Sequence, residues 1–167
     1  MYNHYGDYMK VRIICVGKIK EKYLKDAIGE YSKRLSRFCS FEICELNDEK
    51  IPDNPSEAEC LKVKRNEGEN ILKHLSKDGY VISLCVEGKS MTSEELADKF
   101  KSVTISGKST IDFIIGGSLG LDDAVKSKSD LRLSFSSFTF PHQLMRLILT
   151  EQIYRSFKIN ANEEYHK

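Results

Sequence analysis

The sequence lacks the features that mark membrane, secreted and metal-binding proteins. No uninterrupted apolar run approaches the roughly 20 residues that cross a bilayer, and Met1–Lys10 has no basic-then-apolar secretion signal. The five cysteines are odd in number and include no C-x-x-C pair, and the four histidines are scattered. The cysteines are therefore expected to be small core residues in a reducing compartment. A cytoplasmic protein with no membrane contact and no metal is expected.

Internal repeats, low-complexity tracts and linker-like segments are also absent. The 167 residues fit one domain, and a chain of this length buries roughly 70% of its unfolded surface without disulfides. Residues 1–8 have no periodic pattern and are expected to be a flexible extension, with Met9 as a plausible alternative start. The domain is therefore expected to span residues 9–167.

A net charge of only +1 argues against a general nucleic-acid binder, but the charges are unevenly distributed. Residues 10–37 contain nine Lys or Arg against three acids, whereas residues 42–59 contain seven acids and only Lys50. The basic segment could contact phosphates. Both segments could equally be solvated faces of a helix and a loop.

Apolar, strand-like runs alternate five times with helical patterns. The strands are expected near residues 11–16, 41–46, 80–86, 111–115 and 131–135. The helices are expected over residues 24–38, 56–75, 92–103, 121–128 and 141–159, the second and third beginning at capping boxes (Ser56 with Glu59, Thr92 with Glu95). This alternation predicts an α/β domain with a mostly parallel sheet and helices on both faces. Ligands of such sheets bind beyond the carboxyl ends of the strands, here after Val86, Ile115 and Phe135.

Two of these loops have a composition suited to binding. The run Gly116–Gly120 (GGSLG) can expose backbone N–H groups, but it matches neither the dinucleotide fingerprint nor a P-loop, and a simple tight turn is an equal alternative. The segment Ser134–Phe140 alternates hydroxyls with three phenylalanines, which could enclose a purine-like ring. Some of these phenylalanines are alternatively core anchors.

The last helix is apolar on nearly its whole circumference, which favours coverage by a second chain and hence a homodimer. Arg146, Glu151 and Arg155 interrupt it, and a Glu151–Arg155 ion pair is expected from their i, i+4 spacing. The tail Glu163–Lys167 carries three groups able to exchange protons, although tails of this composition are commonly inert. No Ser-His-Asp order or paired-carboxylate spacing supports hydrolase chemistry.

From Met9 onward the sequence resembles a known family, the ribosomal large-subunit pseudouridine N3-methyltransferases among the trefoil-knotted SPOUT methyltransferases. The matching segments are residues 14–18, Leu84 with Gly88-Lys89, residues 115–120, Leu133-Ser134, residues 139–142, Arg146, Glu151-Gln152, Tyr154-Arg155 and residues 165–167. The extension at residues 1–8 and the segment 160–164 depart from the family pattern.

The resemblance implies a C-terminal trefoil knot, an exception to the usual unknotted rule, and S-adenosyl-L-methionine as cofactor. It also implies a homodimer and, as substrate, a pseudouridine of large-subunit ribosomal RNA in assembled ribosomes. The expected cofactor-binding residues are Leu84, Gly116, Phe135, Ser136, Ser137, Phe138, Thr139 and Phe140.

The reaction requires two oriented reactants and removal of a proton from N3. On the strength of the resemblance, Tyr165, His166 and Arg155 are hypothesised to hold or deprotonate the base. The residues expected to contact the RNA substrate are Lys18, Lys20, Lys25, His142, Arg146 and Lys167. Two alternatives remain, a ribosome-binding factor without catalysis and a nucleotide-dependent oxidoreductase.

Overall fold

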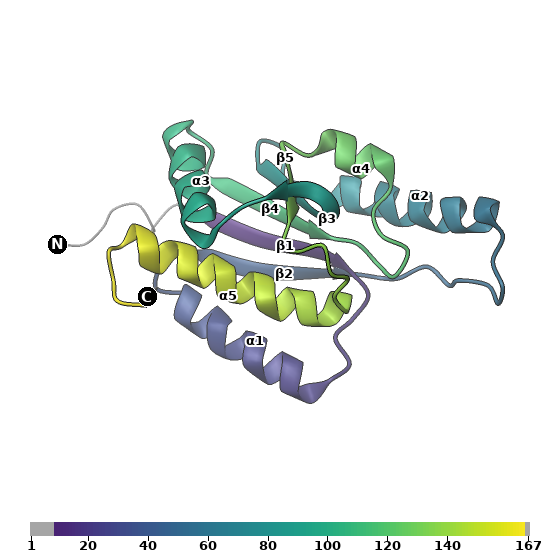
Figure 1. The fold of residues 1–167 in the computed structure, drawn as a ribbon, viewed down its shortest axis with the longest axis horizontal. Coiled ribbons are helices and arrows are strands. Elements are labelled where there is room, and N and C mark those ends of the chain that lie inside the picture. Colours follow the sequence, from purple (N-terminus) through teal and green to yellow (C-terminus); the bar gives the residue numbers. More distant parts are fainter. Residues whose placement is uncertain (1–8, 166–167) are drawn as a thin grey trace.

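The computed structural model describes residues 9–165 and contains a five-stranded parallel sheet with helices on both faces (Figure 1). The strands are β1 (Lys10–Val16), β2 (Ser40–Leu46), β3 (Tyr80–Ser90), β4 (Thr110–Ile115) and β5 (Leu131–Ser134). The helices are α1 (Lys22–Leu35), α2 (Glu57–His74), α3 (Ser93–Ile105), α4 (Asp123–Lys128) and α5 (His142–Asn160). The strand order is β2-β1-β4-β3-β5, and every pair is parallel. The predicted fold class is confirmed. The extension predicted at residues 1–8 lies outside the described residues.

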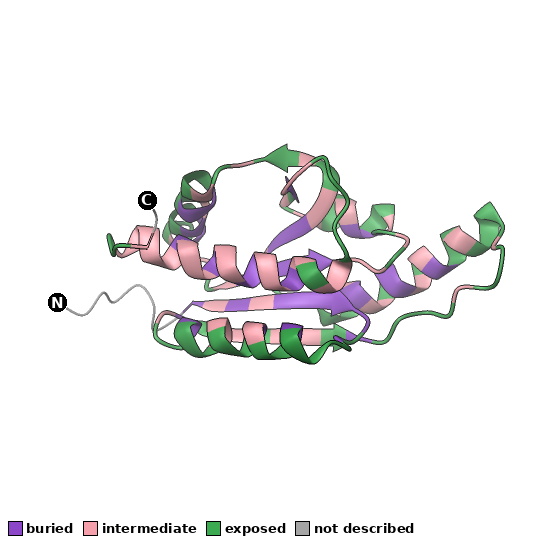
Figure 2. Cartoon of the chain, turned by 60° about the horizontal axis from the view of Figure 1, so that its bottom comes forward, coloured by how far each residue is buried: buried purple, intermediate pink, exposed green. Residues whose placement is uncertain are grey.

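The apolar strands build two core layers, one on each face of the sheet. Alternate residues of β1 point to opposite faces, so Val11, Ile13 and Cys15 meet one set of helices while Ile14 and Val16 meet the other. The first layer is closed by Leu35 of α1, Phe100 of α3, and Leu149 and Ile153 of α5. The second is closed by Ile71 of α2 and Val125 of α4. Figure 2 shows the buried residues concentrated in the central strands and on the helix sides that face them.

Both predicted capping boxes are present. The Ser56 hydroxyl accepts from the Glu59 backbone N–H at 3.2 Å, and the Glu59 carboxylate accepts from the Ser56 N–H at 2.8 Å. Thr92 and Glu95 make the same reciprocal pair at 3.2 and 2.7 Å. These caps fix the starts of α2 and α3, because they satisfy N–H groups that have no partner inside the helix.

The buried side of α2 is short and only partly apolar. Leu61 is 52% exposed, and the buried residues are Val63, Glu67, Gly68 and Ile71. The first half of α2 extends beyond the edge of the sheet, as Figure 1 shows, so the apolar side of that half has no strand to cover it. The buried side of the helix therefore includes a carboxylate, Glu67, beside Val63 and Ile71.

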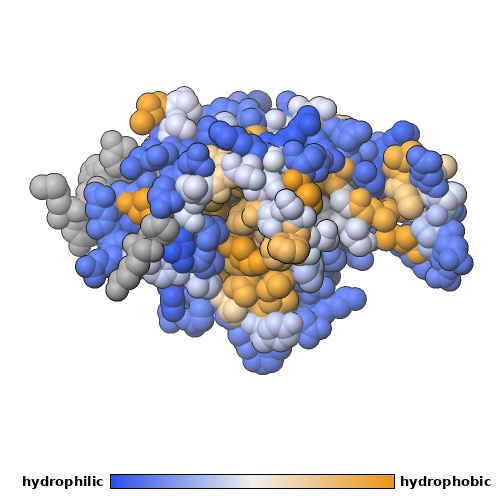
Figure 3. Space-filling view, in the orientation of Figure 1, coloured by the Kyte–Doolittle hydropathy of each residue, from blue (hydrophilic) through white to orange (hydrophobic). Residues whose placement is uncertain are grey.

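The last helix is less uniformly apolar in its contacts than its sequence suggests. It lies between α1 and α3 on one face of the sheet, and its buried side includes Arg146, Thr150 and Ser156 as well as Leu149 and Ile153. Apolar side chains also remain on its outer side, where Leu144 is 36% exposed. Figure 3 shows apolar side chains gathered on this face, over the middle of α5.

Strand β3 is longer than expected and curves around β5. It continues past Val86 to Ser90, and its register with β5 shifts, so that Leu133 pairs with both Leu84 and Lys89. Gly88 permits the close crossing, because a Cβ there would lie 2.8 Å from the backbone of Arg132 and Leu133. The start of the final segment therefore pairs with β3 on both sides of this curve.

A buried charge cluster lies at the amino end of the strands. Asp112 of β4 is fully buried and accepts from the Ser76 backbone N–H at 2.6 Å and from Arg12 at 3.2 Å. Arg12 also donates to the His74 carbonyl at 2.9 Å, at the end of α2. This cluster ties the α2–β3 connection to the centre of the sheet.

The cysteines divide into two groups. Cys15 and Cys39 are buried, as expected, and burial raises the pKa of each thiol to about 12. Cys44, Cys60 and Cys85 are only partly buried. None of the helices within residues 9–165 combines the length and the apolar character needed to cross a bilayer.

Candidate cofactor and substrate site

A cavity of about 700 Å³ opens at the carboxyl ends of the strands. Its walls come from the segments after β3 (residues 84–87), after β4 (residues 115–121) and after β5 (residues 133–142). These are the three loops in which ligand binding was predicted, because parallel strands bring their following loops together at one edge. The volume lies within the range of roughly 300–1,000 Å³ that small-molecule sites occupy.

Seven of the eight residues predicted to bind the cofactor line this cavity. They are Leu84, Gly116, Phe135, Ser136, Phe138, Thr139 and Phe140. Ser137, the eighth, is exposed and is absent from the wall. His142 and Met145, at the start of α5, complete the same wall.

The glycines after β4 are required by close packing. Gly117 and Gly120 pair across the turn, and Gly120 has a φ of +82°, which a residue with a side chain rarely adopts. A Cβ on Gly116 would lie 2.9 Å from the Gly120 carbonyl carbon. The segment is therefore a tight turn, and it also presents backbone to the cavity; the two alternatives considered for it are compatible.

The loop after β5 is held by its own hydroxyls. Ser134 donates to the Ser136 carbonyl at 3.2 Å, and Ser136 accepts from the Phe138 N–H at 3.0 Å. These bonds leave the Phe138 ring 78% exposed and the Phe140 ring at the cavity wall. Of the three phenylalanines only Phe135 packs against the main core, so a core-anchor role fits that residue alone.

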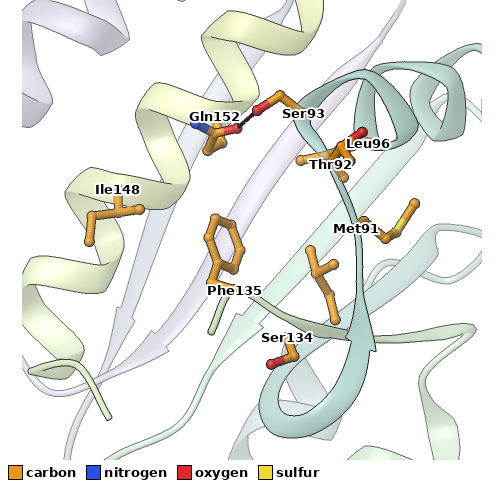
Figure 4. A pocket seen from close by; sticks show the side chains of 9 residues that line it. Met91, Thr92, Ser93, Leu96, Ser134, Phe135, Ile148 and Gln152 are labelled. Atoms are coloured by element: carbon orange, nitrogen blue, oxygen red, sulfur yellow. Dashed lines mark hydrogen bonds between the residues drawn. The ribbon is translucent and has the colours of Figure 1, made fainter. Parts of the chain in front are cut away.

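Phe135 also borders a second, smaller cavity of about 220 Å³. This space lies between the start of α3 and the outer side of α5, and Figure 4 shows the Phe135 ring between α5 and the Met91–Thr92 segment. Ser93 donates to Gln152 at 2.7 Å across its rim. Leu133, Ser134 and Phe135 line both cavities, so one short segment separates them.

The β1–α1 loop is fastened next to the large cavity. Arg146 is fully buried and donates to the Val16 and Gly17 carbonyls at 2.7 and 2.9 Å and to Glu45 at 3.0 Å. Gln143 accepts from the Lys20 N–H at 3.0 Å. Arg146 therefore connects α5 to the ends of β1 and β2 inside the protein. Arg146 was predicted to contact RNA, and such a contact would require it to break all of these hydrogen bonds.

The predicted phosphate-binding lysines sit on or beside this fastened loop. Lys18 and Lys20 are exposed within the loop, and Lys25 is exposed on the first turn of α1. The loop adjoins the α5 N-terminus through Gln143, so these lysines lie on the side of the molecule where His142 lines the cavity. Burial, and then the Arg146 charge, lower the pKa of His142, which favours the neutral imidazole at neutral pH.

The described part of the tail folds back onto α5. Tyr165 donates to Glu151 at 3.1 Å and packs edge-on against Tyr154, and the Arg155 guanidinium lies 4.7 Å from the centre of its ring. The predicted Glu151–Arg155 ion pair is confirmed, at 2.7 Å. Burial, then Tyr31 and Glu151, raise the pKa of the Tyr165 phenol, so it is protonated at neutral pH. His166 and Lys167 lie outside the described residues.

The predicted catalytic residues and the cavity are separated within this chain. Arg155 follows Met145 by ten helical positions, which is about 15 Å along the helix at 1.5 Å per residue. The structure therefore brings the predicted cofactor residues, His142 and the β1–α1 loop with Lys18 and Lys20 (the lysine loop) to one edge of the sheet. It brings Tyr165 against Arg155 farther along α5. Movement of the tail would displace Tyr165 but not Arg155, so a site with both Arg155 and the cavity would need a second copy of the chain.

Comparison with known proteins identifies the family. A family model described as "Predicted SPOUT methyltransferase" matches residues 9–166. This chain belongs to the SPOUT methyltransferase family. The matched range begins at Met9, and the first eight residues lie outside it.

Curated relatives of this SPOUT methyltransferase match it over nearly its whole length. A "Putative ribosomal RNA large subunit methyltransferase H" from Methanococcus maripaludis is 60% identical over 95% of this chain and all of the relative. Proteins named "Ribosomal RNA large subunit methyltransferase H" from Clostridium novyi and Bifidobacterium adolescentis are 58% and 57% identical with the same coverage. A probable methylase family protein from Haemophilus influenzae, 15% identical, matches 94% of this chain and 70% of its own with a TM-score of 0.53, which shows the fold alone.

Glu67 is the residue of this SPOUT methyltransferase site that the sequence did not reveal. It is 7% exposed on α2, directly behind Gly117 of the cavity wall. Its burial raises its pKa. One signal was available, since Glu67 falls four residues after Val63 and four before Ile71, on the buried stripe of an otherwise polar helix.

Proposed function

We propose that this chain transfers a methyl group from S-adenosyl-L-methionine to N3 of a pseudouridine in large-subunit ribosomal RNA. We place this activity on assembled ribosomes in the cytoplasm, with a homodimer as the active form. The observation that carries the proposal is the near-complete match, at 57–60% identity, to relatives named as large-subunit ribosomal RNA methyltransferases.

The residues of the large cavity fit such a cofactor. Apolar walls from Leu84, Phe138 and Met145 suit an adenine ring, while the backbone of the 116–120 turn and the hydroxyls of Ser136 and Thr139 offer polar contacts. The bound cofactor supplies a methyl group on a positively charged sulfur. The protein has to hold that methyl in line with the nucleophile, and the three loops that wall the cavity could orient both reactants.

The proton on N3 must leave when the methyl group arrives. A cation near the ring stabilises the anionic base, a role that we assign to Arg155. Tyr165 stays protonated because its pKa is raised, so it serves as a hydrogen-bond donor to the base, and His166 is the candidate proton acceptor. The lysines of the β1–α1 loop, with Lys25, His142 and Lys167, contact the RNA.

Two features support the homodimer. The outer side of α5 and the adjoining loop leave Leu144, Phe138 and Phe140 exposed at 36%, 78% and 36%, on a face where apolar side chains gather (Figure 3). Arg155, against which Tyr165 of the tail packs, lies about 15 Å along α5 from Met145 of the cavity wall in the same copy. A second copy would cover the apolar face and could bring its tail to the cavity.

The alternatives are weaker. The family assignment opposes the nucleotide-dependent oxidoreductase, and the turn after β4 lacks a dinucleotide fingerprint. A ribosome-binding factor without catalysis would not need the large cavity.

The decisive experiment measures methylation directly. Ribosomes from cells lacking this gene are incubated with the protein and labelled S-adenosyl-L-methionine, and the RNA is digested and analysed by mass spectrometry. N3-methylpseudouridine at one large-subunit position is expected, in assembled ribosomes and not in free RNA. Failure to detect any methyl group, with ribosome binding intact, would favour the non-catalytic factor.

A truncated chain ending at residue 164 separates the tail from the cofactor site. It is expected to bind the cofactor with nearly unchanged affinity in calorimetry and to methylate no RNA. Full activity of the truncated protein would remove the tail from the mechanism.

A further inference from the structure

Glu67 presses its carboxylate against the wall of the large cavity. A Cβ placed on Gly117 would lie 2.9 Å from one Glu67 oxygen and 3.4 Å from the other. Gly117 is itself part of the cavity wall. Only one glycine backbone therefore separates this buried carboxylate from the space in which the cofactor is proposed to bind.

The surroundings of Glu67 do not compensate its charge. One of its oxygens accepts from the Glu49 backbone N–H at 3.1 Å, and no Lys, Arg or His of residues 9–165 forms an ion pair with it. Burial raises its pKa, and the nearby carboxylates of Asp48 and Glu49 raise it further, against the effect of the Glu49 hydrogen bond. An uncompensated buried carboxylate is costly, and such groups cluster at functional sites.

A glutamine would satisfy the same hydrogen bond without the charge, since its side-chain carbonyl could accept from Glu49. The hydrogen bond to Glu49 therefore does not explain why this residue is a glutamate and not a glutamine, and its negative charge requires a separate explanation. A cation on the other side of Gly117 would provide the missing compensation. The proposed methyl donor carries a positive sulfonium, whereas its product after methyl transfer, S-adenosylhomocysteine, has a neutral thioether.

We infer that Glu67 sets the preference of the cavity for the charged methyl donor over the neutral product, acting across Gly117. This inference rests on the proposed function. It makes Glu67 a specificity-determining residue that helps the product to leave, because the attraction disappears when the sulfur loses its charge.

The test compares Glu67→Gln with Glu69→Gln. Both variants remove one negative charge from α2, but Glu69 is exposed, so it controls for the overall charge. Calorimetry measures the dissociation constants of S-adenosylmethionine and S-adenosylhomocysteine for each protein. In Glu67→Gln the preference for the charged donor is expected to fall about five- to tenfold, chiefly through weaker donor binding. Glu69→Gln and the charge-keeping Glu67→Asp should retain most of it.

A stability measurement separates this role from a structural one. A carboxyl whose pKa is raised by folding contributes most stability below its unfolded pKa near 4.5 and loses that contribution as pH rises through the folded value. Glu67→Gln should therefore be at least as stable as the wild type at pH 7.5 in urea unfolding. A purely structural carboxylate would instead make this variant less stable.

Three results would overturn the inference. These are an unchanged donor preference in Glu67→Gln, an equal loss in Glu69→Gln, and a wild-type protein that binds neither compound. The last result would also remove the proposed function, whereas the first two leave it standing. If Glu67→Gln does not fold, Glu67→Met is a second neutral variant for the same comparison.

Discussion

Arg146 of α5 donates a hydrogen bond to the main-chain oxygen of Gly17 at 2.9 Å, which joins the last helix to the first turn of the chain. The same guanidinium reaches Val16 and Glu45, so one side chain connects β1, β2 and α5. Gly17 has a φ of +84°, and its missing Cβ would lie 3.9 Å from the guanidinium. The position of the lysine loop therefore depends on a residue near the other end of the sequence.

Replacing Arg146 with methionine should lower the free energy of unfolding by about 3 kcal/mol, because it leaves Glu45 and two carbonyls without their donor. Urea unfolding followed by circular dichroism measures this loss. Arg65→Met, at an exposed position of α2, is the matched control and should change stability by less than about 0.5 kcal/mol. Stability equal to wild type, together with lost ribosome binding, would restore Arg146 to the RNA-contacting residues.

Phe138→Ser should weaken cofactor binding about tenfold, or roughly 1.4 kcal/mol, because an aromatic face leaves the cavity wall. Its free energy of unfolding should hardly change, since the ring is 78% exposed. Ile105→Ser, at a position 82% exposed on α3, removes a similarly exposed apolar side chain far from the wall and is the control. Calorimetry with S-adenosylmethionine checks both variants, and equal affinities would place the cofactor away from this loop.

A double substitution of Lys18 and Lys20 by glutamine should weaken ribosome binding and reduce its salt dependence. Each lost phosphate contact lowers the slope of log affinity against log salt by about 0.7–0.9. Filter binding at several potassium concentrations measures the slope. Lys77→Gln, exposed before the amino end of β3, should leave it unchanged. An equal loss of ribosome affinity in the double variant and in Lys77→Gln would point to an effect of overall charge instead of a defined phosphate contact.

Asp112→Ala should destabilise the fold without affecting methylation by the folded protein. Arg12 and the Ser76 N–H lose their buried acceptor, at a cost of about 3 kcal/mol. Asp98→Ala removes an exposed carboxylate with a long ion pair of 3.9 Å to Lys101, and its effect should stay within about 0.5 kcal/mol. Thermal unfolding and specific activity are measured for both variants. A lower activity per folded molecule in Asp112→Ala would show that the Asp112 cluster also affects the candidate site.

The order and type of all ten elements could be predicted from the sequence, because each has a local signal. Apolar runs such as Ile111–Ile115 mark buried strands, and capping boxes mark the starts of α2 and α3. The extension of β3 through Glu87-Gly88-Lys89 had no such signal. Beyond the register shift, Lys89 and Ser90 pair with β5 only because the rest of the fold brings β5 beside them.

For the candidate site, the sequence predicted the loop residues but not the residues that helices contribute. The loop residues that line the cavity follow their strands directly, so the strand pattern alone places them at one edge. Glu67 and Gln143 come from helices, and their neighbours Gly117 and Lys20 lie 50 and 123 residues away in the sequence. The burial of Arg146 was equally invisible, because its partners on β1 and β2 are set by tertiary packing.

The pairing of β5 with both sides of the curve in β3 has a consequence for synthesis on the ribosome. Two walls of the large cavity are encoded by residue 121, but the third extends to Met145, and its strand has to pair with β3 at both Leu84 and Lys89. A nascent chain therefore has no complete cavity until nearly all of it has been made. An incomplete chain therefore has no finished cavity in which to hold a small ligand.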